Sequence, residues 1–133
     1  MTTCTRRVEF DAGHRVDGHE SKCARLHGHR YAIEITASAP ELDSVGRVID
    51  FGVLKGVVGK WIDENWDHRM LLWHGDCTLD EEPGVVRVPF NPTAENMAVF
   101  LLEKANELLI DYSVTVVGIR VWETPNCWAD AWR

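Results

Sequence analysis

The chain has 133 residues, of which 45% are hydrophobic and 26% are charged, and its net charge is −7. These values are typical of a soluble globular protein and predict a single domain over residues 1–133. The absence of a basic stripe argues against nucleic acid as a partner. No apolar run approaches the roughly 20 residues that span a bilayer, and the N-terminus lacks a signal-like segment, so we expect a cytoplasmic protein without a membrane partner.

Two strands are predicted first. Residues 7–15 alternate between apolar and charged side chains, and residues 27–37 do the same, which is the period of a strand. His27 and His29 share the apolar face of the second strand. The polar stretch 16–24 lies between the two predicted strands, and we expect it to be a functional loop that joins them as an antiparallel pair.

A helix and a long connection follow. Asp50 is predicted to cap a helix that ends near Asn65, because apolar residues recur between them at helical spacing. Residues 66–91 then form a long connection with one short strand at Val85–Val88. Connections of this length in a small domain are usually functional.

The C-terminal third predicts one more helix and two more strands. Pro92 and Thr93 open the helix, residues 114–123 form a strand, and a short last strand follows the Pro125-Asn126 turn. The element order is therefore strand, strand, helix, helix, strand, strand. It predicts an α+β fold in which a four-stranded antiparallel sheet is covered on one face by two helices.

Three histidines predict a metal site. His27 and His29 are two residues apart on one strand, so both imidazoles point the same way, and His14 lies on the inward face of the strand expected to pair with theirs. Three neutral nitrogen ligands suit zinc and leave a fourth position open, as in catalytic sites. The alternative is that they are hydrogen-bonded, inert residues at the end of a sheet.

Cys23 lies four residues before His27 and admits three interpretations. It is a fourth zinc ligand that would close a structural site, a thiolate base or nucleophile beside the metal, or a small buried hydrophobe. The polar sequence SKCARL argues against simple burial. The remaining cysteines, Cys4, Cys77 and Cys127, are given no functional role, and no disulfide framework is expected.

Other polar residues also suggest chemistry. Glu123 ends the apolar row of its strand, where it either reaches solvent or accepts two hydrogen bonds from the N–C–N edge of a ligand. The Asp67-His68 pair is a weak acid–base signal. His19 and His74 are interpreted as surface residues. A basic cluster for an anionic substrate could come from Arg15, Lys22, Arg25 and Arg30.

Taken together, the motifs resemble one family. FDAGHR, CARLHGHRY, VIDFGVLK, DH, NPTAEN and WET occur in the order and spacing of the 6-pyruvoyltetrahydropterin synthase family. In size and motifs the chain is most similar to the bacterial branch of that family, the 6-carboxytetrahydropterin synthases of 7-deazaguanine (queuosine) biosynthesis. The resemblance covers roughly residues 8–125.

The resemblance implies a role for each matching residue. It implies that the zinc ligands are His14, His27 and His29. Cys23 matches the catalytic general base, and Asp67 with His68 matches the pair that completes a proton relay. Glu123 matches the catalytic-site glutamate that grips the pterin ring, and Thr93 lies in a segment near the pterin.

The resemblance also implies an assembly and a reaction. The family has the tunnelling fold, or T-fold, in which subunits close a barrel as trimers or hexamers with sites between subunits. The implied reaction converts 7,8-dihydroneopterin triphosphate to 6-carboxytetrahydropterin, acetaldehyde and triphosphate. The alternatives are a 6-pyruvoyltetrahydropterin product or a pterin- or zinc-binding protein without turnover.

Overall fold

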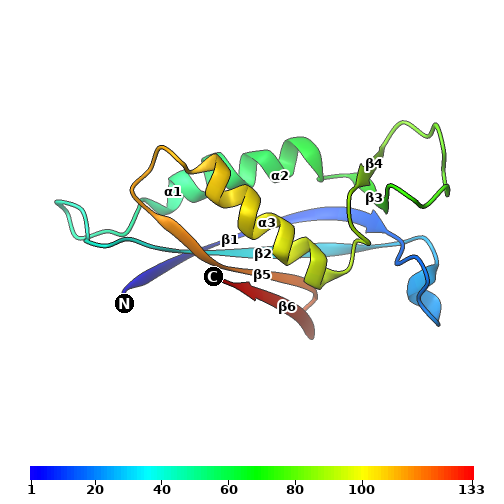
Figure 1. Ribbon diagram of the computed structural model, residues 1–133, viewed down its shortest axis with the longest axis horizontal. Helices are drawn as coiled ribbons and strands as arrows, with labels where there is room; N and C mark the ends of the chain where they lie inside the picture. The colour runs from blue at the N-terminus through cyan, green and yellow to red at the C-terminus, as the bar shows by residue number, and fades with distance from the viewer.

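A computed structural model describes residues 1–133. It contains one six-stranded sheet in the order β4-β3-β1-β2-β5-β6, with the long helices together on one face (Figure 1). The strands are β1 (Thr3–His14), β2 (His27–Ser38), β3 (Arg69–Trp73), β4 (Val85–Val88), β5 (Thr115–Thr124) and β6 (Cys127–Trp132). The helical elements are η1 (Lys22–Ala24), α1 (Phe51–Leu54), η2 (Lys55–Gly59), α2 (Lys60–Asn65) and α3 (Ala94–Leu108). None of these helices is long and apolar enough to cross a membrane.

The two predicted N-terminal strands are confirmed as an antiparallel pair. β1 and β2 align along their whole length, from Thr3 opposite Ser38 to His14 opposite His27. Their apolar side chains point toward the helices, where Phe10 stacks on Tyr31 with ring centroids 5.1 Å apart. The alternation in the sequence therefore indicates that the β1–β2 pair has one face covered by helices and one polar face.

Both predicted helices are also confirmed. The Asp50 side chain accepts a hydrogen bond from the amide of Gly52, and the helix runs through α1, η2 and α2 to Asn65. Its middle segment, η2, is π-helical, which the periodicity did not predict. Thr93 caps α3 by accepting a hydrogen bond from the amide of Asn96. Each cap marks the residue at which its helix begins.

The predicted four-stranded antiparallel sheet is wrong in strand number and direction. Within the expected 66–91 connection, β3 adds to β1 in parallel, and β4 adds to β3 in parallel. The strand β3 escaped prediction because Leu71 and Leu72 are both fully buried, so the strand has no polar face and no alternation. Strand β4 lies where the short strand was expected, at Val85–Val88.

Besides the short strand β4 at one end of the sheet, two longer edges have no neighbouring strand within the chain. β3 pairs with β1 only at residues 12–14, so the outer edge of β1 is unpaired over most of its length. At the other side of the sheet, β6 pairs only with β5. Such edges are open to pairing with strands from another chain.

Candidate metal centre and substrate cavity

The pairing of β1 with β2 brings three imidazoles together at the end of the sheet. His14 lies directly opposite His27, and His29 lies opposite Ala12 on the same face. The Nε2 atom of His14 is 2.9 Å from Nε2 of His27 and 3.1 Å from Nε2 of His29. One ring nitrogen from each of the three histidines lies within 4.8 Å of those of the other two, and no further residue joins this group. The predicted convergence on one point is therefore what the structure shows.

Hydrogen bonds to backbone carbonyls orient two of the rings. His14 Nδ1 donates to the carbonyl of Pro92 at 2.7 Å, and His27 Nδ1 donates to the carbonyl of Arg25 at 2.7 Å. A carbonyl oxygen only accepts, so the proton of each neutral ring resides on Nδ1. The lone pair on each Nε2 then faces the common centre, as in histidines that bind metals.

Burial favours the neutral form of His14 and His29, which is the form that binds a metal. Burial lowers the pKa of His14 to about 4; the neighbouring His27 and His29 lower it further, while the Pro92 carbonyl opposes the change. Burial and the charge of His27 lower the pKa of His29 as well. Neutral, convergent nitrogens fit a divalent metal ion.

A cavity of about 200 Å³ adjoins the histidine group through His14. Four predicted site residues line it, namely His14, Cys23, Thr93 and Glu123. Cys23 lies in η1, and the cavity places its side chain near the metal centre while leaving it outside the group of converging nitrogens. This arrangement favours the interpretation of Cys23 as a reactive group rather than as a fourth metal ligand.

Glu123 reaches the same cavity from the end of β5. Its Oε1 atom is 3.9 Å from Nε2 of His14, and its side chain is 26% exposed. Burial raises the pKa of Glu123, the negative charge of Glu95 adds to this, and His27 opposes it. A half-buried carboxylate that has no cationic side chain fixed to it is suited to receive the N–H donors of a ligand.

Asp67 and His68 form a pair, but the structure does not bring them to this cavity. His68 Nδ1 is 2.9 Å from Asp67 Oδ2, and the amide of Asp11 donates to Asp67 Oδ1 at 3.0 Å. Burial raises the pKa of Asp67, but these hydrogen bonds outweigh it and the pKa is lowered. His68 has a left-handed φ of 58° and a side chain that is 75% exposed. Asp11 points away from the helix-covered face, so the pair serves a different surface of this chain.

The expected basic cluster is only partly available. Arg15 is bound by the carboxylates of Asp17 and Asp76 at 2.8 and 2.7 Å. Arg30 is bound by Asp11 at 2.9 Å. Two of the four expected cations are thus engaged within the chain. The remaining two, Lys22 and Arg25, form no ion pair and flank Cys23 in sequence.

Sequence reasoning missed three residues near the centre. His19, interpreted as a surface residue, lines the same cavity as Cys23, and its Nδ1 accepts a hydrogen bond from the amide of Ser21 at 3.0 Å. Glu95 lines the cavity from the first turn of α3, and Pro92 contributes a carbonyl to the metal centre. No residue spacing signals His19 or the Pro92 carbonyl, whereas the proximity of Glu95 to Thr93 in sequence could have indicated it.

Comparisons with known proteins agree with this geometry. The sequence profile of the family described as 6-pyruvoyl tetrahydropterin synthase matches residues 3–133. A Rickettsia felis protein named 6-carboxy-5,6,7,8-tetrahydropterin synthase is 43% identical, over 98% of this chain and 99% of that protein. A Haemophilus influenzae protein of the same name is 33% identical, over 98% of each chain.

Solved structures share the fold. The 6-pyruvoyl tetrahydropterin synthase of Caenorhabditis elegans superposes with a TM-score of 0.74 at 24% identity, over 99% of this chain and 95% of that one. A Wolinella succinogenes protein superposes with a TM-score of 0.83, also at 24% identity, over 99% of this chain and 98% of that one. The six-stranded mixed sheet with helices on one face is thus a T-fold, and the chain belongs to the 6-pyruvoyl tetrahydropterin synthase family.

Proposed function

We propose that this protein is a zinc-dependent 6-carboxy-5,6,7,8-tetrahydropterin synthase of the 7-deazaguanine (queuosine) pathway. It converts 7,8-dihydroneopterin triphosphate and water to 6-carboxytetrahydropterin, acetaldehyde and triphosphate. Full-length relatives that carry this name support the activity. The observation that carries the proposal is the cavity beside His14, one of three converging imidazoles, because the thiol of Cys23 and the half-buried carboxylate of Glu123 line the same cavity.

The residues that would hold zinc are His14, His27 and His29. Their Nε2 atoms converge, and backbone carbonyls hold the Nδ1 protons of His14 and His27. Zinc held there would supply a Lewis acid for the side chain of the substrate, and a set of three protein ligands is typical of a catalytic site.

Residues of the chain itself bind the substrate and transfer its protons. Glu123 accepts hydrogen bonds from the N–C–N edge of the pterin. These bonds fix the ring so that the side chain of the substrate points toward Cys23. Cys23, as a thiolate, removes a proton from a carbon of that side chain. Thr93 lines the cavity at the start of α3 and bounds the ring. Asp67 orients His68, which exchanges a second proton with the substrate.

The placement of His68 supports a site shared between subunits. Asp67 and His68 lie outside the cavity that contains Cys23, so one chain alone holds only part of the proposed proton relay. The unpaired edges of β1 and β6 offer surfaces on which a trimer, or a hexamer of two trimers, could close. We therefore propose a homo-oligomer of single-domain subunits, each spanning residues 1–133.

Product identification tests the activity. Zinc-loaded protein is incubated with 7,8-dihydroneopterin triphosphate, and the products are identified by mass. We expect acetaldehyde and 6-carboxytetrahydropterin from the wild type. The Cys23→Ala variant should keep its zinc and lose turnover, whereas Cys127→Ala, which removes an exposed thiol, should behave as the wild type.

Other results would point to the alternatives. A 6-pyruvoyltetrahydropterin product would instead assign this protein the 6-pyruvoyl tetrahydropterin synthase activity for which the family is named. Bound zinc and bound pterin without turnover would make it a binding protein. Loss of zinc in Cys23→Ala would make the thiol a metal ligand and the site a closed structural one.

A further inference from the structure

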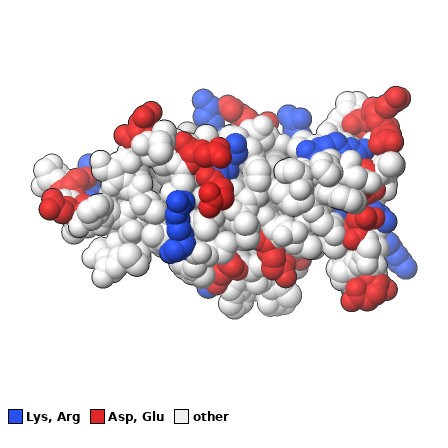
Figure 2. All heavy atoms as spheres, in the orientation of Figure 1, with Lys and Arg blue, Asp and Glu red and all other residues white.

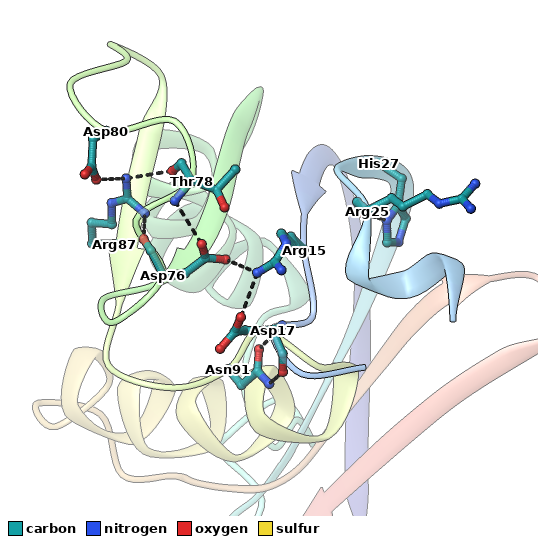
Figure 3. A network of polar contacts seen from close by, with 9 residues as sticks. All are labelled: Arg15, Asp17, Arg25, His27, Asp76, Thr78, Asp80, Arg87 and Asn91. Atoms are coloured by element: carbon teal, nitrogen blue, oxygen red, sulfur yellow. Dashed lines mark hydrogen bonds and ion pairs between the residues drawn. The ribbon is translucent and has the colours of Figure 1, made fainter. Parts of the chain in front are cut away.

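A buried carboxylate lies in the segment that connects β3 to α3, residues 74–91. The Asp76 side chain is only 3% exposed, and its Oδ2 accepts a hydrogen bond from Arg15 Nη1 at 2.7 Å. Its Oδ1 accepts one from the amide of Thr78 at 2.9 Å. Figure 3 shows Asp76 and Arg15 pointing toward each other from different parts of the chain. Burying such a pair carries a desolvation cost, so its value lies in fixing geometry rather than in stability alone.

The same segment is braced from within by a second arginine. Arg87 Nη1 donates to the backbone carbonyl of Asp76, and Arg87 Nη2 donates to the carbonyl of Thr78 at 2.9 Å and to Asp80 at 3.0 Å (Figure 3). These bonds close the turn that carries Asp76. The carboxylate is therefore presented to Arg15 by a rigid turn.

A second connection joins this segment to the end of β1. The Asn91 side chain accepts a hydrogen bond from the amide of Asp17 at 3.0 Å and donates one to the carbonyl of Asp17 at 2.8 Å. Asn91 is itself fixed, because its carbonyl accepts from the Asn96 side chain at 3.0 Å. The Asn91 side chain thus bonds both the backbone amide and the backbone carbonyl of Asp17.

Both connections converge on the metal ligand His14. Arg15 directly follows His14 and Asp17 is three residues after it, while Asn91 directly precedes Pro92, whose carbonyl accepts the Nδ1 proton of His14. We propose that Asp76 and Asn91 are positioning residues, which hold His14 and the Pro92 carbonyl at hydrogen-bonding distance and so aim His14 Nε2 at the metal. Segment 74–91 then serves as the outer support of the metal centre.

This inference rests on the proposed metal site, and it predicts a measurable loss of affinity. Partners that orient a metal-binding histidine typically contribute 10–100-fold to metal affinity or activity. Asp76 acts through Arg15, so we expect Asp76→Asn to weaken zinc binding by about tenfold, at the lower end of that range. Arg15→Met should do the same, and the double variant should lose little more because both act on one contact.

The experiment uses the full-length protein and two readouts that need no substrate. The first is the zinc dissociation constant from competition with a chromophoric chelator, supported by the visible spectrum of the Co²⁺-substituted protein. The second is the His14 Nδ1–H resonance in ¹⁵N-edited NMR of the metal-free protein. We expect Asp76→Asn to change the Co²⁺ bands and to broaden the His14 proton by faster exchange with water.

A matched control removes a similar ion pair elsewhere. Asp130 binds Arg120 at 2.7 Å on β6, and Asp130→Asn should leave both readouts at wild-type values. If Asp76→Asn lowers stability but leaves zinc affinity, the Co²⁺ spectrum and the His14 proton unchanged, segment 74–91 is only structural and the proposal is overturned. If Asp76→Asn does not fold, Asn91→Asp and Arg15→Lys are judged by the same criteria.

The two proposals fail in different ways. A wild-type protein that binds no zinc would refute the proposed function, and this is seen without any variant. In that case the NMR readout still decides the positioning role, because the hydrogen bond between His14 and Pro92 does not need the metal. An unchanged His14 proton in Asp76→Asn would then refute it.

Discussion

Tyr31 lies between the histidine centre and the aromatic core, and its hydroxyl has no hydrogen-bond partner among protein atoms although it is buried. Its ring meets those of His14 and His29 edge-on, with centroids 5.9 and 5.4 Å apart. Burial, with a smaller contribution from Glu123, strongly raises the pKa of the hydroxyl. A buried hydroxyl without a partner costs free energy, so its removal need not destabilise the fold.

We therefore expect Tyr31→Phe to leave the free energy of unfolding unchanged or to raise it by about 1 kcal/mol. Urea unfolding of the metal-free protein measures this, with Phe10→Leu as a core substitution that should destabilise. A loss of more than about 1 kcal/mol in Tyr31→Phe would show that the hydroxyl makes a stabilising hydrogen bond.

Glu123 offers a second prediction for a single residue. An amide cannot accept two hydrogen bonds from an N–C–N edge, so Glu123→Gln should weaken pterin binding by about 10–100-fold, as expected for a charge-assisted pair. Fluorescence titration with biopterin, which lacks the triphosphate, measures this affinity. Glu95→Gln, in the same cavity, is the matched control and should change affinity less than about threefold. Equal effects of the two variants would exclude a specific anchor.

The short helix η1 begins at Lys22 and is followed by Arg25, so cations stand on both sides of Cys23 in the sequence. Arg25 has no acidic partner, so it is free to meet the triphosphate of the proposed substrate. We expect Arg25→Gln to raise KM about tenfold with little change in kcat, because it contributes binding rather than chemistry. Steady-state kinetics test this, with Arg47→Gln, whose side chain is bound by Asp43, as the control. A fall in kcat at constant KM would contradict the prediction.

Segment 74–91 has its own dependence on pH. Burial raises the pKa of Asp76, but the hydrogen bonds from Thr78 and the charge of Arg15 outweigh it, so the pKa is lowered in the folded state. A lowered carboxyl pKa stabilises the fold above the unfolded-state value of about 3.9, and this contribution is lost as the pH falls through the folded-state value. Asp76→Asn should therefore reduce stability at neutral pH and narrow its difference from wild type in acid. Thermal unfolding of both metal-free proteins from pH 7 to pH 3 measures the difference, and a constant difference would contradict it.

Segment 74–91 also carries a group of exposed acidic side chains. In Figure 2 acidic side chains gather over the loop between β3 and β4, where Asp80, Glu81 and Glu82 are exposed. Only Asp80 among these three meets a cation, Arg87 at 3.0 Å. The exposed acids thus lie outside the Asp76 network, and this local charge does not supply the metal centre with ligands.

At the scale of the whole molecule, the proposed shared site can be tested by mixing variants. If Cys23 of one subunit works with His68 of another, Cys23→Ala and His68→Ala are each inactive but complement each other. Random reassembly at equal amounts should restore roughly a quarter of wild-type activity, because half of the sites keep each residue. Light scattering checks that the mixture forms trimers or hexamers. No recovery after unfolding and reassembly would place both residues in one chain's site.

Several features of this protein are determined by local sequence. Alternation set β1 and β2, caps at Asp50 and Thr93 set the helix starts, and the two-residue spacing of His27 and His29 set their common direction. Each of these depends on interactions between residues near in sequence, which repeat with a known period. The α+β class and the common direction of His27 and His29 were therefore predictable before the structure, whereas the number and direction of the strands were not.

Only the tertiary structure decided the remaining features. The parallel addition of β3, the burial of Asp76 against Arg15 and the Pro92 carbonyl at His14 join residues far apart in the chain, and no local period encodes them. The same is true of His19 beside Cys23, and of the separation of His68 from that cavity. Such contacts arise from packing whole elements together, so the sequence alone determined which groups could react, whereas the fold decided which of them meet.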